Sequence, residues 1–466
     1  MTCLPFGGMF LVLLVNLYTF LIGTSRAVYT ALFNLYLKHQ HLDNTIIGRS
    51  TFYYSWGLAI GGFIFASLSD KIGRKKTILL TLPMYVLFGL SRIYEPSHTF
   101  LLYFFSFLFG FFDTSVILPT ISVIESSDEK KRLRNSNINF AIVLLTGVIG
   151  YFGAGALAKV FGLGKSLVFS MILALVAALP VFAFPDVRVY RKKRGKEKLT
   201  LIQKTMLTYY MLSGALVSLA AGVFINFGNV IFYDLFAFST TVITGILAIS
   251  QLSTALTSLF SHKLAAKYGY KLTLFLVYLG VTLLIFAMPL FMLNSTAFSV
   301  AYVLRYILIN ISTPMYMVFC LSYLPKSSLA TYSGLNFFLN NVMRAMSAQL
   351  FAGLSKGGTT DYNKLFLVSG FFYLVNTLAT LLAFYLMYKL SSMDSKISEK
   401  STLQSDQKSD GRESMVVRLR SNGQKKSLTF VTAKRRSNKR SNKSVSVHFH
   451  MPPTRDRFNG VHSKRR

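Results

Sequence analysis

The sequence predicts an all-α integral membrane protein whose twelve transmembrane helices form two pseudo-symmetric six-helix bundles. Apolar residues make up 52% of the 466-residue chain and charged residues only 14%, a balance outside the range of soluble globular domains. Twelve stretches are long and apolar enough to cross about 30 Å of hydrocarbon as a helix. The second six stretches also repeat residues of the first six at a nearly constant offset.

The predicted spans follow from the apolar runs, because backbone polar groups in lipid must be satisfied within the spanning segment. We place the spans at residues 8 to 37, 46 to 68, 77 to 94, 99 to 124, 136 to 161, 166 to 185, 205 to 233, 241 to 261, 272 to 293, 297 to 323, 330 to 354 and 365 to 389. We expect no disulfide or metal framework, because the chain has only two cysteines, Cys3 and Cys320.

Basic residues are unevenly divided between the two sets of loops. Up to residue 390, one set of alternate loops carries 21 Lys and Arg and the other carries 7. The smaller set is Lys38, Arg49, Arg92, Lys159, Lys165, Lys356 and Lys364. Positive residues mark the cytoplasmic side, so we expect both termini in the cytoplasm and the protein in the plasma membrane.

The two halves repeat one another. A shift of 196 brings Leu68, Lys71, Gly73, Lys75, Thr77 and Leu80 onto Leu264, Lys267, Gly269, Lys271, Thr273 and Leu276. A shift of 197 pairs Tyr36 with Tyr233, Asn139 with Asn336 and Phe140 with Phe337, and sets Asn310 opposite Asp113. The predicted domains are therefore an N-terminal bundle (1 to 186), a basic connector (187 to 204), a C-terminal bundle (205 to 390) and a disordered basic tail (391 to 466). Paired repeats of this kind build alternating-access transporters.

Two short motifs carry a resemblance to a known family. The stretch "SLSDKIGRKK" (67 to 76) resembles the signature between the second and third helices of the major facilitator superfamily (MFS). Asp70, Gly73, Arg74 and Lys75 match that pattern, whereas Lys71 replaces the usual Arg and Ala66 replaces a common Gly. The stretch "ISVIESSDEKKRLRN" (121 to 135) is similar to the segment after the fourth helix of that family. With the repeat, the likeness covers about residues 8 to 390.

The resemblance implies an inner gate in these two loops. It implies that Asp70 lies near the start of the eleventh helix, and that Arg74 reaches an acid below the fourth, Glu125 or Asp128. A simpler interpretation of the basic residues is that they only anchor the loop at the membrane surface. The gate candidates are Asp70, Gly73, Arg74, Lys75, Glu125 and Arg134.

Four ionisable residues lie away from the ends of the predicted spans, namely Arg26, Asp113, Arg305 and Arg344. Each costs roughly 2.5 to 3.5 kcal/mol at a helix centre and so needs a partner or a function. In a structural interpretation, Asp113 neutralises Arg26, and the other two arginines bond to carbonyls, Asn310 or Asn341. In a functional one, the arginines bind an organic anion and Asp113 carries a proton. The substrate and coupling candidates are Arg26, Asp113, Arg305, Asn310 and Arg344.

The predicted function is secondary active transport of a small organic solute, with an anion favoured and protons as the coupling ion. One alternative is efflux of lipophilic drugs by proton antiport, which the 42 Phe and 16 Met would suit. The glycines of "GVIGYFGAG" (147 to 155) resemble a pattern of efflux members, but its proline is missing. A second alternative is a receptor or scaffold that keeps the transporter fold. An enzyme is the least favoured class, because no catalytic grouping or phosphate-binding loop is present, and we expect no cofactor.

The tail determines the expected partners besides a small-molecule substrate. Residues 391 to 466 hold 19 Lys and Arg against 6 acids. We expect this polybasic segment to contact anionic lipids of the inner leaflet. Nucleic acid is a less economical partner, since no folded recognition module is present. We expect a monomer.

Overall fold

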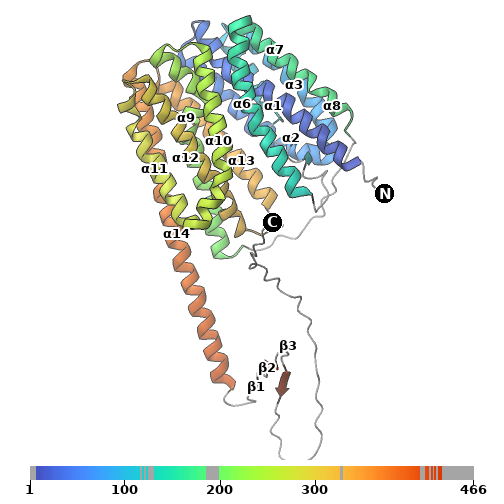
Figure 1. Ribbon diagram of the computed structural model, residues 1–466, viewed down its shortest axis with the longest axis vertical. Helices are drawn as coiled ribbons and strands as arrows, with labels where there is room; N and C mark the ends of the chain where they lie inside the picture. The colour runs from blue at the N-terminus through green and yellow to red at the C-terminus, as the bar shows by residue number, and fades with distance from the viewer. Residues whose placement is uncertain are drawn as a thin grey trace, which may run out of the picture. The chain divides into compact units, whose positions relative to one another are not determined.

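The computed structural model describes residues 7–115, 118–119, 122–123, 131–184, 199–325, 329–409, 415–418, 421–422, 425–426 and 429–432. Its helices run side by side along the bundle in Figure 1. The first half contains α1 (Gly7–His39), α2 (Asn44–Ile72), α3 (Arg74–Tyr94), α4 (Thr99–Phe111), α6 (Arg132–Phe161), α7 (Leu163–Val176) and α8 (Ala178–Phe182). The second half contains α9 (Leu201–Phe236), α10 (Thr240–Tyr268), α11 (Tyr270–Phe291), α12 (Ser295–Ser322), α13 (Leu329–Leu354) and α14 (Thr359–Ser409).

Every predicted span overlaps at least one of these helices. Within the described residues, ten helical segments are long and apolar enough to cross a membrane, one of which joins α7 and α8, and α4 is a shorter apolar helix. The remaining helix, α13, carries more polar residues, among them Asn336, Asn341 and Arg344. A polar helix is stable inside a bundle only where neighbouring helices shield it from lipid. Accordingly, α13 packs between α2 of the first half and α9 of the second.

Local capping chemistry sets several helix ends. The Asp43 carboxylate accepts a hydrogen bond from the backbone N of Ile46 at the start of α2. Thr200 and Gln203 form a reciprocal capping box at the start of α9. At the start of α12, the Asn294 side chain accepts hydrogen bonds from the backbone N of Thr296 and of Ala297. These caps satisfy donors that would otherwise have no partner in the first helical turn.

The α2–α3 turn and the α10–α11 turn have the same backbone design. Gly73 has φ 97° and ψ 152°, and Gly269 has φ 78° and ψ 153°, a region that residues with a Cβ rarely adopt. Thr77 and Thr273 donate their hydroxyl hydrogens to the carbonyl oxygens of these glycines, at 2.9 and 2.8 Å. The residues that repeat in the sequence therefore have equivalent roles in the two halves.

Among the described residues, the halves meet chiefly through three pairs of helices, α2 with α13, α6 with α10, and α1 with α9, and α1 makes a smaller contact with α10. Small residues permit this approach. A Cβ built on Gly48 of α2 would lie 2.8 Å from the backbone N of Ala352 on α13. One built on Gly155 of α6 would lie 2.3 Å from the hydroxyl oxygen of Thr244 on α10.

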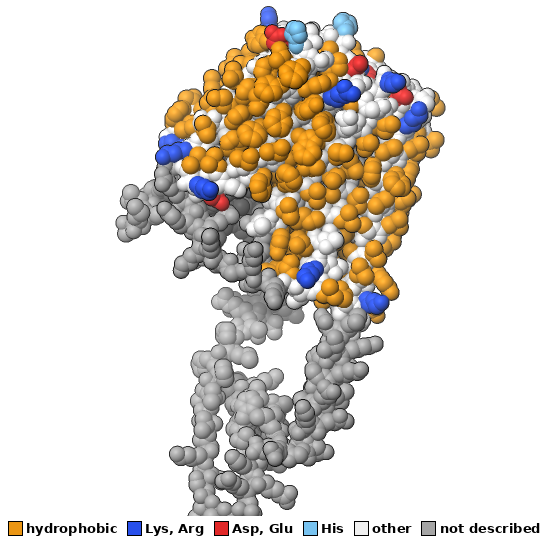
Figure 2. Space-filling model, turned by 180° about the vertical axis from the view of Figure 1, so that it is seen from behind, with side chains coloured by type: hydrophobic (Ala, Val, Ile, Leu, Met, Phe, Trp, Pro, Cys, Tyr) orange, Lys and Arg blue, Asp and Glu red, His pale blue; other side chains and the backbone are white. Residues whose placement is uncertain are grey.

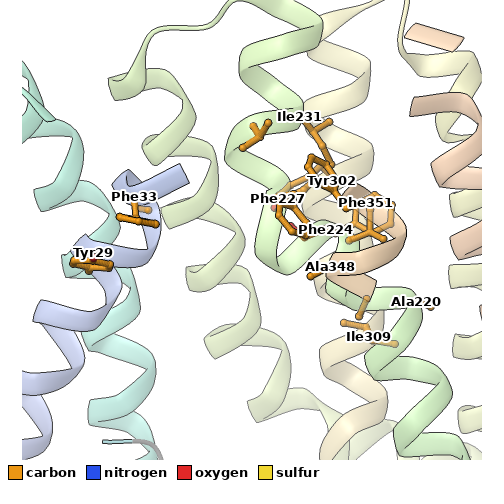
Figure 3. Packing of buried hydrophobic residues seen from close by; sticks show 14 of the residues in the cluster. Tyr29, Phe33, Ala220, Phe224, Phe227, Ile231, Tyr302, Ile309, Ala348 and Phe351 are labelled. Carbon is orange, nitrogen blue, oxygen red and sulfur yellow. The ribbon is translucent and has the colours of Figure 1, made fainter. Parts of the chain in front are cut away.

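Aromatic side chains fill the core of each half. Figure 3 shows Phe224, Phe227, Tyr302 and Phe351 gathered between α9, α12 and α13, with Tyr29 and Phe33 on α1 in the other half. The rings of Phe227 and Phe351 stack with centroids 3.8 Å apart. Such packing holds α9 against α13, so those two helices are expected to move together.

The outer surface of the bundle is apolar. Figure 2 shows a broad hydrophobic face on which charged side chains gather near the ends. Large hydrophobic residues such as Phe100, Leu283 and Leu293 are exposed on the surface of the bundle. An apolar belt of this kind is the surface that a transmembrane bundle presents to lipid.

One sequence-based placement differs from the structure. The distribution of basic residues places Arg92 in a loop, but Arg92 is 4% exposed, lies inside α3 and packs against aromatic rings. The predicted end of the twelfth span at residue 389 agrees with the membrane-spanning segment Thr359–Leu390, and α14 itself continues to Ser409, with no Pro or Gly in residues 371 to 410. The predicted domain limits stay a prediction.

The chain divides into two compact units, Met1–Tyr388 and Lys389–Arg466. In the second unit, β1 (Met415–Arg418) pairs antiparallel with β4 (Thr429–Thr432), and β2 (Ser421–Asn422) pairs with β3 (Lys425–Lys426). All other described elements are helices. The candidate site lies within the first unit.

Candidate functional site

A hollow lies between the two halves of the bundle. It consists of two adjoining cavities of about 440 and 370 Å³. The cavities share lining residues from both halves, including Thr30, Tyr151, Asn226, Gln251 and Arg344. This is the size and position expected of a site for a small organic molecule in a protein built from two repeats.

Arg26 and Asp113 form an ion pair beside the smaller cavity. The Arg26 Nε lies 3.2 Å from the Asp113 Oδ2, and Asp113 is buried. The hydroxyl groups of Tyr54 and Ser115 donate to the two oxygens of Asp113, at 2.9 and 2.5 Å. The backbone N of Ser115 also donates to Asp113, which turns the chain just after α4 ends. The ion pair between Arg26 and Asp113 is the contact that the structural interpretation of the sequence expected.

Arg305 is fully buried on α12 and lines the larger cavity. Its Nη2 donates to the hydroxyl of Tyr373 at 2.8 Å. The rings of Phe224 and Tyr306 lie near the guanidinium, with centroids 5.2 and 4.9 Å from its Cζ. Its Nε and Nη1 have no hydrogen-bond partner in the part of the chain that the structure describes. Arg305 thus retains donors for an acceptor from outside the chain.

Arg344 lies on α13 and lines both cavities. Its Nε is buried without a hydrogen-bond partner, and no ion pair of the described residues includes it. Asn310 also lines the larger cavity, where its amide donates to the Thr254 hydroxyl and the Tyr306 carbonyl. The amide of Asn341 donates to the Phe337 carbonyl. The suggested bonds from arginine to these asparagines are therefore not among the contacts of Arg305 and Arg344.

The hollow is bounded by a polar network at the end where α1 joins α2, called here the α1–α2 end. Lys38 Nζ lies 2.9 Å from Asp234 Oδ1. The Asp234 Oδ2 accepts hydrogen bonds from Asn44 at 2.8 Å and Tyr362 at 2.6 Å. Asn44 also contacts Ser355 at 3.0 Å. Because Lys38 and Asn44 belong to the first half and the other three residues to the second, this network joins the halves.

The gate candidates lie at the opposite end, where α2 joins α3. Arg74 Nη2 lies 2.5 Å from Asp70 Oδ1, one helical turn away, and Arg74 also donates to Ser69. Lys75 donates to the Phe182 carbonyl at 2.6 Å. Arg134 is exposed near the start of α6. Glu125 and Asp128, the acids expected opposite Arg74, lie outside the described residues.

Sequence reasoning missed Arg92 and the Lys38–Asp234 pair as features of the site. The signal for Arg92 was available, since it lies inside the predicted third span of residues 77 to 94. The signal for Lys38 and Asp234 was weak, because both lie near the ends of helices, where charges are common. Their pairing depends on how the halves meet.

The chain resembles known proteins in sequence and in fold. A family model described as Major Facilitator Superfamily matches residues 15–348. The curated protein "Solute carrier family 22 member 13" of Homo sapiens is 42% identical over 65 residues, which cover 14% of this chain and 11% of that protein. The chain therefore matches only a small part of that relative's length.

Several solved structures share the fold. The nucleoside transporter NupG has a TM-score of 0.61 at 18% identity and covers 80% of this chain and 99% of its own. An inward-facing, occupied bacterial homologue of the human lysosomal transporter Spinster has a TM-score of 0.65 at 14% identity, over 82% and 97%. A D-xylose-proton symporter has a TM-score of 0.63 at 14% identity, over 82% and 97%. These likenesses confirm the predicted twelve-helix fold class.

Proposed function

The chain belongs to the major facilitator superfamily, and from this premise we propose that it moves a small organic anion across a membrane by alternating access, with protons as the coupling ion. Membership confirms the sequence-based identification of a multi-pass membrane transporter rather than an enzyme. The substrate, the coupling ion and the orientation are parts of the proposal.

An excess of positive charge around the hollow is the observation that carries the choice of an anion. Arg26, Arg305 and Arg344 all line it. Among the described residues of the spans, Asp113 is the acid next to the hollow, and its carboxylate already forms an ion pair with Arg26. A buried charge without a partner is costly, so an anionic substrate would offset the cost at Arg305 and Arg344. The planar guanidinium also suits a carboxylate or phosphate better than an ammonium would.

The rest of the lining suits an organic body attached to that anionic group. Tyr151, Tyr306, Ile309 and Phe140 present aromatic and aliphatic surface to the larger cavity. Pockets for small organic molecules combine such surface with a few polar groups that fix orientation. Asn310 and Gln251 supply uncharged polar groups there.

The arrangement of the ends supports alternating access. The network of Lys38, Asn44, Asp234, Ser355 and Tyr362 joins the halves at the α1–α2 end. Separating the halves there requires breaking those contacts, while Asp70 and Arg74 occupy the opposite end. We propose the network as the outer gate and the Asp70–Arg74 motif as part of the inner gate. This assignment uses the orientation with both termini in the cytoplasm.

Asp113 is the proposed proton carrier. Its carboxylate is buried, bonded to Arg26 and next to the smaller cavity through Tyr54 and Ser115. Protonation of Asp113 would release Arg26 from its ion pair and so change the charge presented to a substrate. One structural neighbour is a D-xylose-proton symporter, which supports proton coupling on this fold.

Drug efflux has less support from the contacts of α6. A Cβ on Gly147 would lie 2.6 Å from the Gln251 side chain of α10, and Gly155 is close to Thr244. These glycines serve the contact between the halves, which any alternating-access transporter needs. They therefore do not favour efflux over uptake.

The test is charge movement in proteoliposomes on a supported membrane, together with the pH inside the proteoliposomes, because symport of one proton with a monovalent anion moves no net charge. Organic anions, sugars and lipophilic cations are applied in turn, with and without a pH gradient. We expect currents with anions, and about tenfold or greater loss of transport efficiency in Arg344→Gln and Arg305→Gln, since a hydrogen bond from a charged donor contributes on that scale. Arg49→Gln is the matched control, because Arg49 is exposed and lines neither cavity.

Three outcomes would contradict the proposal. Currents with sugars or lipophilic cations that Arg344→Gln leaves unchanged would exclude an organic anion as the substrate. Anion currents that do not depend on pH would exclude the proton as the coupling ion. Silence of a folded protein across the whole panel would favour a receptor or scaffold.

A further inference from the structure

A third, smaller cavity lies between α1, α2, α3, α4 and α9 and is called here the arginine nook. Its volume is about 60 Å³, against about 440 Å³ for the larger cavity of the hollow. By the same measure, a cavity of about 10–15 Å³ holds one water. The nook is lined by Arg26, Asn34, Tyr54, Tyr85, Arg92 and Asn226, among others. It has room for a few waters or a small inorganic ion but not for a drug-sized organic solute.

Arg92 gives the nook its charge. The Cζ of its guanidinium lies 3.8 Å from the ring centroid of Phe33, and 4.9 Å from that of Phe109. Its Nη2 donates to the Ser50 hydroxyl at 3.2 Å. No ion pair of the described residues includes Arg92. Aromatic rings attract a cation more weakly than a carboxylate does, so the charge of Arg92 is only partly offset.

The nook is rich in hydrogen-bond donors that lack acceptors. Four of its lining residues each hold a buried atom with no hydrogen-bond partner among the described residues: Arg26 Nε, Tyr85 OH, Arg92 Nε and Asn226 Nδ2. Arg26 Nε lies 3.2 Å from Asp113 but does not form a hydrogen bond with it. Three of these atoms only donate, and the tyrosine hydroxyl can donate. Unpartnered donors on residues that line one small cavity favour an anion there.

Both halves of the bundle build the nook. Asn226 lies on α9 of the second half, and its carbonyl oxygen accepts a hydrogen bond from the Asn34 amide of α1 at 2.8 Å. A second bond between the same helices runs from the Asn229 amide to the Ala31 carbonyl at 2.9 Å. The nook is therefore complete only while α1 and α9 are in contact. A ligand held there would stabilise this arrangement of the halves.

We propose that the arginine nook binds a monovalent inorganic anion of about the size of chloride, separately from the transported solute. The anion accepts hydrogen bonds from Arg92 and its neighbours and offsets the buried positive charge. It favours the conformation in which α1 contacts α9. This site does not depend on the proposed substrate, because the nook is too small for an organic anion and Arg92 lines neither large cavity.

Thermal unfolding of the purified full-length protein in detergent tests the site. Sodium chloride, bromide or nitrate replaces sodium gluconate at constant ionic strength, so that general screening is unchanged. We expect the unfolding temperature of the wild-type protein to rise with chloride and to saturate. In Arg92→Gln the rise should vanish, or half-saturation should need at least about tenfold more chloride. In Tyr85→Phe, a milder change, half-saturation should move in the same direction by less.

Arg305→Gln is the matched control. Arg305 is likewise buried and flanked by aromatic rings, but it does not line the nook. We expect this variant to keep the chloride response. A wild-type protein that does not respond to any of the three anions would overturn the proposal. So would an equal chloride response in the folded Arg92→Gln and Tyr85→Phe variants, or a response that Arg305→Gln abolishes as completely. A benzoate response lost in Arg92→Gln would show that the nook belongs to the organic substrate instead.

Discussion

Replacing Asp234 with asparagine should release the two halves from each other at the α1–α2 end. The Asp234 side chain is 6% exposed and Lys38 is 16% exposed, so water screens their 2.9 Å contact only weakly. Asp234 also accepts the hydrogen bonds of Asn44 and Tyr362. It is thus the shared acceptor of one cation and two neutral donors.

Asparagine has nearly the same shape but only one acceptor oxygen. If that oxygen faces Asn44 and Tyr362, the new amide NH2 faces the Lys38 ammonium, and if it faces Lys38, the NH2 faces the Asn44 amide. Breaking a buried pair by removing one charge costs about 3–5 kcal/mol. Because some hydrogen bonds survive, we expect a loss of about 2–3 kcal/mol in the closed state. That changes the ratio of closed to open molecules by about 30- to 150-fold.

Labelling of a single cysteine measures this change. The reporter is Thr30→Cys, which lies on α1 and lines the hollow, in a background where Cys3 and Cys320 are replaced by serine. A membrane-impermeant maleimide is applied from the side of the α1–α2 loop. We expect Asp234→Asn to accelerate labelling by at least about tenfold, within the population change above.

Asp361→Asn is the control, because Asp361 lies at the same end and accepts only the backbone N of Lys356 among the described contacts. This variant should label at the parent rate. Parent-like labelling of Asp234→Asn, in a protein that folds and inserts normally, would refute the role of the network as a gate.

Three further predictions concern the helices that meet at the hollow. Gly48→Val should slow transport and lower the unfolding temperature, because its side chain would overlap the backbone of Ala352, a cost of about 1–3 kcal/mol, whereas Gly153→Val, with open space around its Cα, should leave both unchanged. Asp113→Asn should abolish accumulation driven by a pH gradient but keep exchange of substrate across the membrane, and gradient-driven accumulation by this variant would remove Asp113 as the proton carrier. Asp70→Asn should slow turnover without reducing insertion, since it loses the 2.5 Å contact to Arg74, and unchanged turnover in reconstituted protein would exclude the latch.

Features that depend on neighbouring residues were predictable from the sequence. The apolar runs indicated the helices, because a membrane requires each span to satisfy its own backbone, and ten described segments are apolar and long enough to span by themselves. The repeat indicated that Gly73 and Gly269 hold equivalent turns, and their φ and ψ values agree closely. Arg26, Arg305 and Arg344 were identifiable as candidates because charges within spans are costly. Each of them lines the hollow.

The partners of those charges were decided by the tertiary structure. The sequence left open whether Asp113 serves Arg26 or a substrate, and the fold sets the two side chains 3.2 Å apart. No sequence pattern indicated that Lys38 pairs with Asp234, or Asn34 with Asn226. The two residues of each pair are about 190 positions apart and meet only because the halves pack face to face. The environment of Arg92 was also decided by the tertiary structure, since a residue near a helix end can face either the lipid headgroups or the interior. Hydropathy is a property of a segment, so the sequence determined the helices, but electrostatic pairing is a property of positions in space, so only the packed bundle determined the site.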